Sequence, residues 1–553
     1  MKSKLGLLGL LVMLTTLTAC TSQLANSNKT SDSKGIMSQN QTVTITEQSP
    51  LSTVDISKVA SFTKLRSSTE GLFRLGKNSH VNAGLAKSYT VSKNAKVYTF
   101  NLRQNARWSD GEPITASDFV YSWQRSVAPK TRSVNAGLFT GIKNATQVRK
   151  GTLPVSKLGV KALSKHRLQV TLSHPIVYFE TLLAYPLFAP QHKAMVDRYG
   201  NRYGMSADTQ LYSGPFKLVH WKADSKTRTL VPNPYYWDKA HVYLKRLTIT
   251  TQKSPAASLK AFNAGKIAET QLIGAQIPAN EDRTDYVVRP FSLMRDINYN
   301  FNTANKSAKQ LINNRNARLA ISHAIDRKLL INTALQNASL PPKGFVTVGL
   351  SKNNLTHSDF ADQQRGTSYV KGNPSVAKQE WQLACNQLKQ SRFTLTLTIP
   401  NDLVSLKVGT NIKQQLMKRL NGLTINLNTI PSKQLTKQAT QGHYELLLSG
   451  WGADYPDPLT FLQIMTDNSR HNYGHWQNQT YNELVDQISD SQNGNAQTRW
   501  EQMLTAEKLL MTQQAITPLY QQADSYLTDA KLNGVVHNIS GVVNDYKSAY
   551  MVK

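Results

Sequence analysis

One carboxylate between Gly450 and Pro458 is the side chain in this sequence best placed to meet the charge of a ligand. The residues before it, Tyr444–Ser449, form a short apolar run that ends at a glycine and is typical of a buried strand. Asp457 followed by Pro458 resembles the capped start of a helix. Asp454 is therefore expected in a strand-to-helix loop. Taken alone, the local pattern favours an aspartate that caps its own turn.

No catalytic signature accompanies this loop. The sequence lacks a His-Glu-x-x-His pair, a Gly-x-Ser-x-Gly elbow, clustered cysteines and a dinucleotide glycine fingerprint. His471 and His475 have the spacing of metal ligands on a helix, but Gly474 between them indicates a loop and argues against a metal site. Residues 70–77 resemble a phosphate loop, yet Asn78 stands where a Ser or Thr would ligate magnesium. The pattern favours a binding protein over an enzyme.

The length and charge of the chain limit the number of domains and the kinds of partner that are expected. At 553 residues the chain is too long for one ordinary core, so two or three domains are expected. The 65 Lys and Arg residues outnumber 34 Asp and Glu residues, for a formal net charge of +31. The basic residues are scattered singly, which argues against a nucleic-acid partner and favours a solvated surface. A basic surface would also suit a position beside an anionic envelope or membrane face.

The first 41 residues predict an export leader and a tether. Lys2 and Lys4 precede an apolar run too short to span a bilayer, and the leader ends at Leu17-Thr18-Ala19-Cys20. This ending resembles a bacterial lipobox, which implies lipidation of Cys20 as the first mature residue. Residues 21–41 are polar and would form a flexible tether of roughly 25 Å. Only Cys385 then remains, within an expected helix and as a buried free thiol, so an intramolecular disulfide is excluded.

The body of the chain alternates between strand and helix patterns. Thr115 and Asp118 predict a capped helix start, with Phe119 and Trp123 on its core face. A second capping box is expected at Thr480 and Glu483, with Tyr481, Leu484, Val485 and Ile488 buried. A helix is also expected to carry Ile321, Ala324, Ile325 and Leu329 on one face. Further strands are expected near Thr42 and over 98–103, 168–172, 214–221, 244–250, 395–399 and 423–427, with a helix over 412–420.

Five stretches, in this order, resemble the family 5 extracytoplasmic solute-binding proteins, and specifically the oligopeptide-binding lipoproteins of ABC importers. The stretches are Tyr98–Arg125, Gly214–Trp221, Asn233–Asp238, Asn314–Lys328 and Gly450–Pro458. The resemblance implies an α/β, two-lobed periplasmic-binding-protein-like fold (class II, cluster C type) with three domains and a ligand cleft between the lobes. Domain I would comprise residues 42–85, 206–295 and 524–553, domain II residues 86–205, and domain III residues 296–523.

The resemblance also implies the site. Asp454 would bind the α-ammonium group of a peptide, with Gly450, Trp451, Gly452 and Tyr455 around it. The main chain of Glu70 and Leu72 would pair with an extended peptide, as a strand added to a sheet edge. Relatives that prefer short peptides often carry a cation where this chain has Leu448. A C-terminal carboxylate would then remain solvated or meet a mobile side chain such as Lys437.

The implied function is capture of oligopeptides, by closure of two lobes, for delivery to ABC importer permease subunits with their ATPases. The protein would be a monomer without cofactor or nucleic acid, held by its lipid on the outer face of the cytoplasmic membrane, in the cell envelope of a Gram-positive bacterium. Rival ligands are a specific signalling peptide, nickel and haem. An envelope-anchored peptidase is the alternative from a different class.

Overall fold

The computed structural model describes residues 36–65, 67–77, 80–489 and 495–553. The leader, the lipobox with Cys20, most of the expected tether and Asn78 lie outside the described residues. Within them, no helix combines the length and apolar character needed to cross a bilayer.

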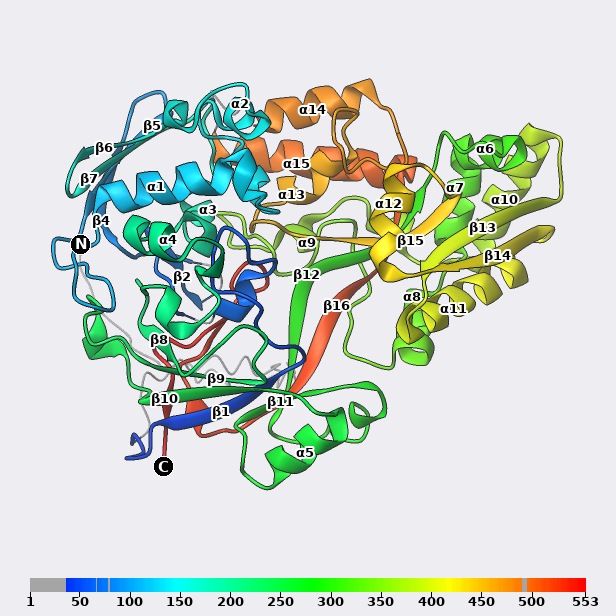
Figure 1. The fold of residues 1–553 in the computed structure, drawn as a ribbon. Coiled ribbons are helices and arrows are strands. Elements are labelled where there is room, and N and C mark those ends of the chain that lie inside the picture. The colour runs from blue at the N-terminus through cyan, green and yellow to red at the C-terminus, as the bar shows by residue number, and fades with distance from the viewer. Residues whose placement is uncertain (1–35, 66, 78–79, 490–494) are drawn as a thin grey trace, which may run out of the picture.

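A mixed ten-stranded sheet runs through the whole body (Figure 1). Its order is β14-β13-β15-β12-β16-β11-β1-β10-β9-β8. The pairs β13–β14, β13–β15, β1–β10 and β1–β11 are parallel and the other neighbours are antiparallel. The strands are β1 (Thr42–Glu47), β8 (Phe216–Val219), β9 (Thr227–Pro232), β10 (Arg246–Thr251), β11 (Glu269–Leu272), β12 (Tyr286–Tyr299), β13 (Phe393–Pro400), β14 (Leu423–Ile430), β15 (Leu446–Gly452) and β16 (Ile516–Thr528).

The remaining strands lie in smaller sheets. An antiparallel sheet of order β4-β5-β7-β6 contains β4 (Ala86–Val91), β5 (Val97–Leu102), β6 (Val160–Ser164) and β7 (Arg167–Thr171). Three strand pairs complete the set: β2 (Phe73–Leu75) with β3 (Val81–Ala83), β17 (Leu532–Asn533) with β20 (Tyr550–Met551), and β18 (Val536–His537) with β19 (Asn544–Asp545).

Helices cover these sheets. The helices before β12 are α1 (Ala116–Val127), α2 (Ala145–Lys150), α3 (Phe179–Leu182), α4 (Lys193–Tyr199) and α5 (Pro255–Asn263). Those that follow are α6 (Lys306–Asn313), α7 (Arg315–His323), α8 (Arg327–Leu330), α9 (Phe360–Gln363), α10 (Pro374–Leu388), α11 (Leu403–Arg419), α12 (Leu435–Thr440), α13 (Leu459–Leu462), α14 (Gln479–Ser489) and α15 (Ala496–Gln513).

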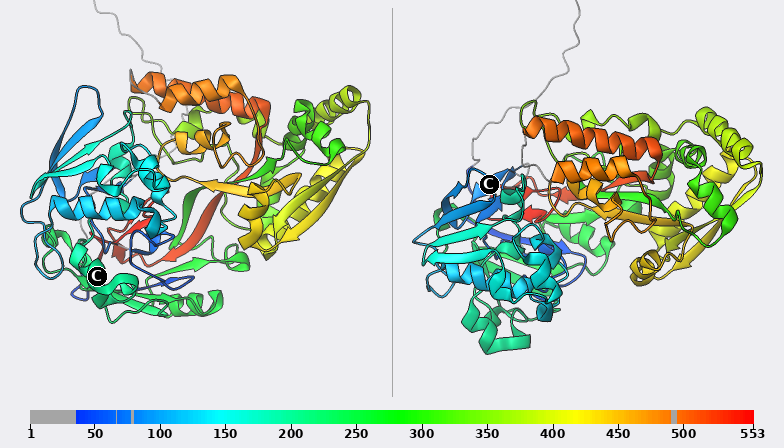
Figure 2. Two further views of the ribbon diagram at one scale, coloured as in Figure 1. Left: turned by 45° about the horizontal axis from the view of Figure 1, so that its top comes forward. Right: turned by 90° about the horizontal axis from the view of Figure 1, so that it is seen from above.

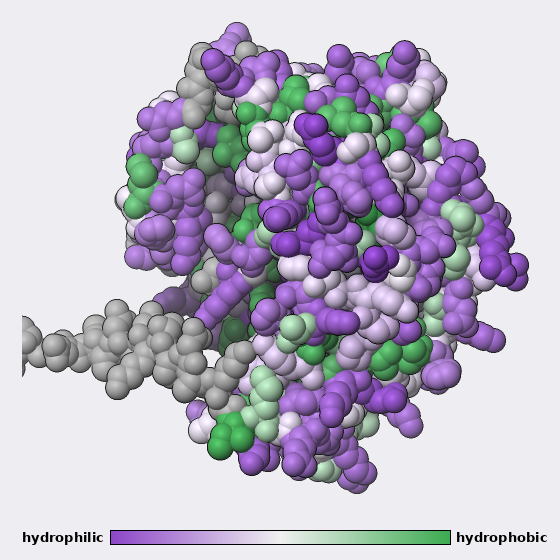
Figure 3. All heavy atoms as spheres, turned by 90° about the vertical axis from the view of Figure 1, so that its left-hand side faces the viewer, coloured by the Kyte–Doolittle hydropathy of each residue, from purple (hydrophilic) through white to green (hydrophobic). Residues whose placement is uncertain are grey.

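Two large hydrophobic cores divide the molecule into lobes. The core of the first lobe draws its residues from Val43 to Ala268 and from Leu532 to Ala549. The core of the second lobe draws its residues from Met294 to Tyr520. The first core includes segments assigned above to both domain I and domain II, and the domain boundaries themselves stay a prediction. In Figure 3, hydrophilic side chains cover most of the outer face of the first lobe, and hydrophobic ones occur in small groups.

Only two long strands of the described chain carry the large sheet from one lobe to the other. β12 and β16 pair antiparallel along most of their length and lie side by side in both views of Figure 2. Their register shifts between Pro290 and Met294 and again between Arg295 and Asp296. β-bulges of this kind locally bend and twist a strand pair. The shifts therefore mark where the strand pair departs from regular pairing between the lobes.

Most of the expected elements are confirmed. The helix start at Thr115 is a true capping box, in which the Thr115 backbone N–H donates to Asp118 Oδ2 at 2.7 Å. Phe119 and Trp123 are fully buried. The expected strands correspond to β1, β5, β7, β8, β10, β13 and β14, and the helix over 412–420 is the second half of α11.

The helix expected to carry Ile321 to Leu329 is wrong in one respect, because it is two helices. α7 ends at His323, and the Asp326 side chain caps α8 by accepting the backbone N–H of Leu329 at 3.0 Å. The buried Arg327 guanidinium donates to the carbonyl groups of Ser322 and Ile325 in this break. Side chains of the second helix therefore do not face in the directions that one continuous helix would give them, and Leu329 is 42% exposed.

Three smaller expectations also need correction. α14 begins before Thr480, and its cap is the Asn478 side chain, which accepts the Tyr481 N–H at 2.9 Å. The tether ends earlier than residue 41, because the buried Gln41 side chain exchanges two hydrogen bonds of 2.9 Å with the Met551 backbone. Cys385 lies in α10 and is free, but it is half-buried rather than buried.

Candidate functional site

A cavity of about 750 Å³ lies between the two lobes. The first lobe lines it with residues 134–141, Arg149 at the end of α2, and residues 174–182. The second lobe lines it with Trp451, Asp454, Tyr455 and parts of 459–471, and with residues of α14 and α15. Ligand sites in proteins have volumes of this order and are found preferentially at domain interfaces.

The glycine-tryptophan segment continues a strand of the second lobe instead of forming a loop. β15 extends to Gly452, and Trp451 pairs with Met294 of β12. A Cβ atom on Gly450 would lie 2.7 Å from the Met294 carbonyl oxygen, so this position accepts only glycine without a shift of the backbone. The pairing with β12 fixes the direction in which the chain leaves the sheet toward Asp454.

Asp454 does not cap its own turn, so the local interpretation was wrong. Its backbone N–H donates to Thr460 Oγ1 at 3.1 Å, but no hydrogen bond or ion pair from a described residue reaches its carboxylate. The residue is exposed to the cavity. Burial by the surrounding walls raises the pKa of Asp454 to about 6, and the charge of Arg470 opposes this shift. The site thus holds an unpartnered carboxylate beside an open volume.

The helix start after Asp454 is held by a buried ion pair. Asp457 Oδ1 accepts the Leu459 N–H at 2.9 Å, as expected of a cap, and α13 follows. The same carboxylate receives two hydrogen bonds from the Arg499 guanidinium, at 2.8 and 2.9 Å. Arg499 lies in α15 and was not predicted, because no local pattern connects it to Asp457.

The two predicted aromatic side chains have different surroundings. Trp451 is half-buried, and its ring centroid lies 4.7 Å from that of His471. Tyr455 is buried and stacks on Tyr178 of the first lobe, with centroids 4.1 Å apart and ring planes within 6°. Tyr178 is therefore a cavity residue that sequence reasoning missed.

Glu70 and Leu72 are not brought together with Asp454. Both are buried in the first lobe and neither lines the large cavity. The Glu70 main chain exchanges hydrogen bonds with the Ser213 hydroxyl, and the Leu72 carbonyl accepts from Gly84 and Ala86. Their role as main-chain partners of a peptide stays a prediction.

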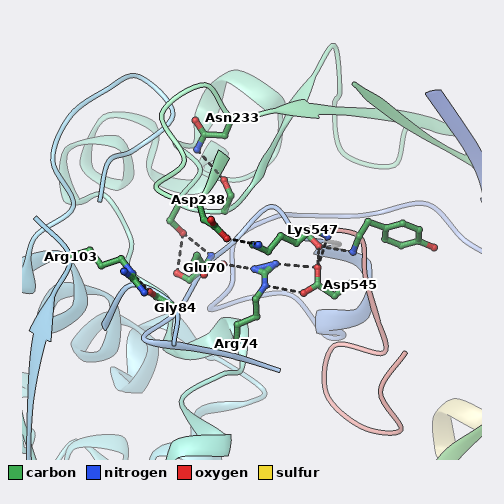
Figure 4. A network of polar contacts seen from close by, with 12 residues as sticks. Glu70, Arg74, Gly84, Arg103, Asn233, Asp238, Asp545 and Lys547 are labelled. Carbon is green, nitrogen blue, oxygen red and sulfur yellow. Dashed lines mark hydrogen bonds and ion pairs between the residues drawn. The ribbon is translucent and has the colours of Figure 1, made fainter. Parts of the chain in front are cut away.

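The Glu70 side chain has a clear structural role (Figure 4). Arg74 lies between the carboxylates of Glu70 and Asp545, with its Nη2 donating to Asp545 Oδ1 at 3.1 Å. Lys547 pairs with Asp238 at 2.5 Å. Burial raises the pKa of Glu70, and Arg74 opposes that shift. The network fastens the C-terminal residues onto β2.

The cations of the cavity are not those considered from the sequence. Leu448 is buried in the core of the second lobe, Lys437 is exposed on α12, and neither lines the cavity. Arg149 of the first lobe and Arg470 and Arg499 of the second lobe do line it, and Arg499 is already in an ion pair. The Arg149 Nε atom is buried and has no hydrogen-bond partner among the described residues. A carboxylate in the cavity would therefore have three arginines within its walls, two of them outside that ion pair.

His471 and His475 do not form a metal site with other side chains of the described residues, which contain no cluster of three potential metal ligands. His475 adopts a positive φ of 57°, in agreement with the loop predicted for this segment. His471 lies against Trp451 in the cavity wall, and burial together with the neighbouring Arg470 lowers its pKa.

Comparison with known proteins matches this chain to one family. The family described as bacterial extracellular solute-binding proteins, family 5 Middle, matches residues 80–473. A dipeptide-binding protein of Lactococcus lactis subsp. cremoris is 32% identical over 538 residues, which cover 96% of each chain.

Solved structures agree with this match. The substrate-binding domain of an oligopeptide ABC transporter from Bacillus anthracis is 32% identical, with a TM-score of 0.76 over 94% of this chain and 100% of that one. Listeria monocytogenes OppA bound to peptide is 31% identical, with a TM-score of 0.75 over 93% of this chain and 100% of that one. The expected two-lobed α/β fold is confirmed.

Proposed function

Because the chain belongs to the family 5 bacterial extracellular solute-binding proteins, we propose that it captures oligopeptides outside the cytoplasm and delivers them to an ABC importer. The observation that carries the proposal is the unpartnered Asp454 carboxylate in a cavity between two lobes. A peptide α-ammonium group would supply the missing charge. Broad recognition of the rest of a peptide would come from its backbone and from wet pockets for its side chains.

The mechanism follows from the two crossing strands. β12 and β16 are the covalent connections between lobes, and their register shifts allow bending there. A ligand that contacts residues of both lobes stabilises the closed arrangement relative to the open one. The importer permease would then recognise the closed protein.

Purified protein incubated with a mixed peptide pool tests the proposal. We expect intact peptides to be recovered with the protein, detected by native mass spectrometry before and after the incubation. Cleavage of the pool, with the Asp454→Asn variant less active, would instead support an envelope peptidase. Recovery of nickel or haem and of no peptide would also contradict the proposal.

Peptide affinity is expected to depend on pH through Asp454. The pKa of Asp454 is raised to about 6, so its carboxylate is charged above that pH and neutral below it. The peptide α-amino group stays protonated between pH 5 and 7. Lowering the pH from 7 to 5 should therefore weaken binding roughly tenfold, as measured by calorimetry.

Two nearby groups make a control necessary. Burial and the charge of Arg470 lower the pKa of His471, which is a second titratable group in the cavity wall. In Asp454→Asn the tenfold decrease should disappear while any contribution of His471 persists. A pH dependence equal in both proteins would assign the effect to His471 or another group.

We also propose that Cys20 is lipidated and that the lipid holds the protein on the outer face of the cytoplasmic membrane, in a Gram-positive envelope. The support is the leader that ends at Leu17-Thr18-Ala19-Cys20 and the polar residues that follow. Cys20→Ser should abolish labelling by a radioactive or clickable fatty acid and release the protein into the medium. Cys385→Ser, the matched control, should leave labelling unchanged. Labelling that persists in Cys20→Ser would contradict the anchor.

A further inference from the structure

A second cavity lies next to the first and shares a wall with it. Its volume is about 170 Å³, and its lining includes residues 351–355, Pro456, Gln497 and Trp500. Val177, Tyr178 and Arg499 line both cavities. Much of the second lining is polar, since it contains Ser351, Lys352, Asn353 and Asn354.

The wall between the cavities includes the ring of Tyr178, and the ring of Tyr455, which lines only the large cavity, stacks on it. Tyr178 packs against the hydrophobic cores of both lobes and stacks on Tyr455, at 4.1 Å between centroids. Tyr455 follows Asp454 directly in the chain. Burial, with a smaller contribution from the charge of Asp454, raises the pKa of both tyrosines. Asp454 lines the large cavity and not the second one, so it lies on the large-cavity side of the stack.

We propose that the Tyr178–Tyr455 stack ends the peptide site just beyond the α-amino group and excludes peptides with bulk on their N-terminal nitrogen. The proposal rests on the proposed function, in which Asp454 binds that group. A substituent on the nitrogen would have to enter the second cavity, and the rings close the way to it. Selection for a free N-terminus thus has a steric component that is separate from the charge of Asp454.

A peptide with an N-isopropyl group separates bulk from charge, because the secondary ammonium remains cationic. Extra methyl groups do not fit into a packed wall without strain, so wild-type protein should bind the N-isopropyl peptide roughly 5-fold to 150-fold more weakly than the free peptide, which is about 1–3 kcal/mol. Tyr178→Ala removes one ring and joins the two cavities. In this variant the two peptides should bind within about threefold of each other by calorimetry.

Two control variants test whether the effect comes from loss of the Tyr178 ring. Tyr178→Phe retains the ring and should retain the full discrimination. Tyr235→Ala removes an exposed ring that lines neither cavity, and it should behave as wild type. If Tyr178→Ala does not fold, Tyr178→Val removes the ring while keeping an apolar contact with both cores.

The outcomes separate this inference from the proposed function. Failure of wild-type protein to bind the free peptide would overturn the proposed function. Binding of the free peptide with equal tolerance of the N-isopropyl group would overturn only the inference. An isopropyl penalty that is the same in wild type and in the ring-deleted variant would also overturn it.

Discussion

Asp454→Asn is expected to weaken the binding of peptides with a free α-amino group by roughly 2–5 kcal/mol, which is about 30-fold to 5,000-fold in Kd. No described residue pairs with the Asp454 carboxylate, so a bound ammonium group would be its main partner. Removing the carboxylate leaves that ammonium group in a closed cleft without its counter-charge. Calorimetry with one peptide series measures the loss directly.

N-terminally acetylated peptides provide an independent check of the role of Asp454. N-terminal acetylation removes the cation from the other side of the pair, so it should weaken binding to wild type comparably and add little in Asp454→Asn. Asp486→Asn makes the same charge change elsewhere on the cavity wall and should alter affinity by less than about 1 kcal/mol. Acetylated peptides that bind wild type as tightly as free ones would refute the role of Asp454.

Arg74→Met is expected to destabilise the first lobe by roughly 3–5 kcal/mol. Arg74 lies between Glu70 and Asp545, and the Glu70 side chain is fully buried. Without the guanidinium, two neighbouring carboxylates remain in a poorly solvated place. The two-lobed protein need not unfold in one step, so hydrogen exchange of β2, β3 and residues 532–551 should accompany urea denaturation.

Two further variants identify the cause of that loss. Arg365→Met removes the cation of an exposed pair with Glu501 and should cost less than about 1 kcal/mol. Adding Glu70→Gln and Asp545→Asn to Arg74→Met should recover much of the stability, because the unpaired charges are then gone. Equal small losses in Arg74→Met and Arg365→Met would show that the buried network does not stabilise the lobe.

Features of the fold that depend on neighbours in the sequence could be predicted. The Thr115–Asp118 capping box and the buried faces of α1 and α14 follow from spacing alone, and the structure contains them. The prediction failed where a distant or buried contact decides the outcome. At the break after α7, the buried Arg327 side chain donates hydrogen bonds to main-chain carbonyl groups. The spacing of apolar residues in the sequence gives no sign of such a contact.

In the site too, features set by neighbours in the sequence could be predicted and contacts between distant residues could not. The loop that carries Asp454 was predicted because strand, glycine and helix-start signals lie within residues 444–458, whereas the ligand role expected of Asp454 came from the family resemblance. Tyr178 and Arg499 were missed because each meets the loop only after the chain has folded. Tyr178 comes from the other lobe, where it directly precedes α3. A single sequence cannot reveal such pairs.

The position of Asp545 and Lys547 has a consequence for biosynthesis. These residues follow the whole second lobe in the sequence, yet they complete the ion pairs of Arg74 and Asp238 in the first lobe, which already contains β1. The second lobe is contiguous, so it can form while the tail is still being synthesised. An exported chain would thus expose an unfinished first lobe until residues 532–549 have crossed the membrane. Removal of residues 540–553 should accordingly make the first lobe, and not the second, the target of envelope proteases.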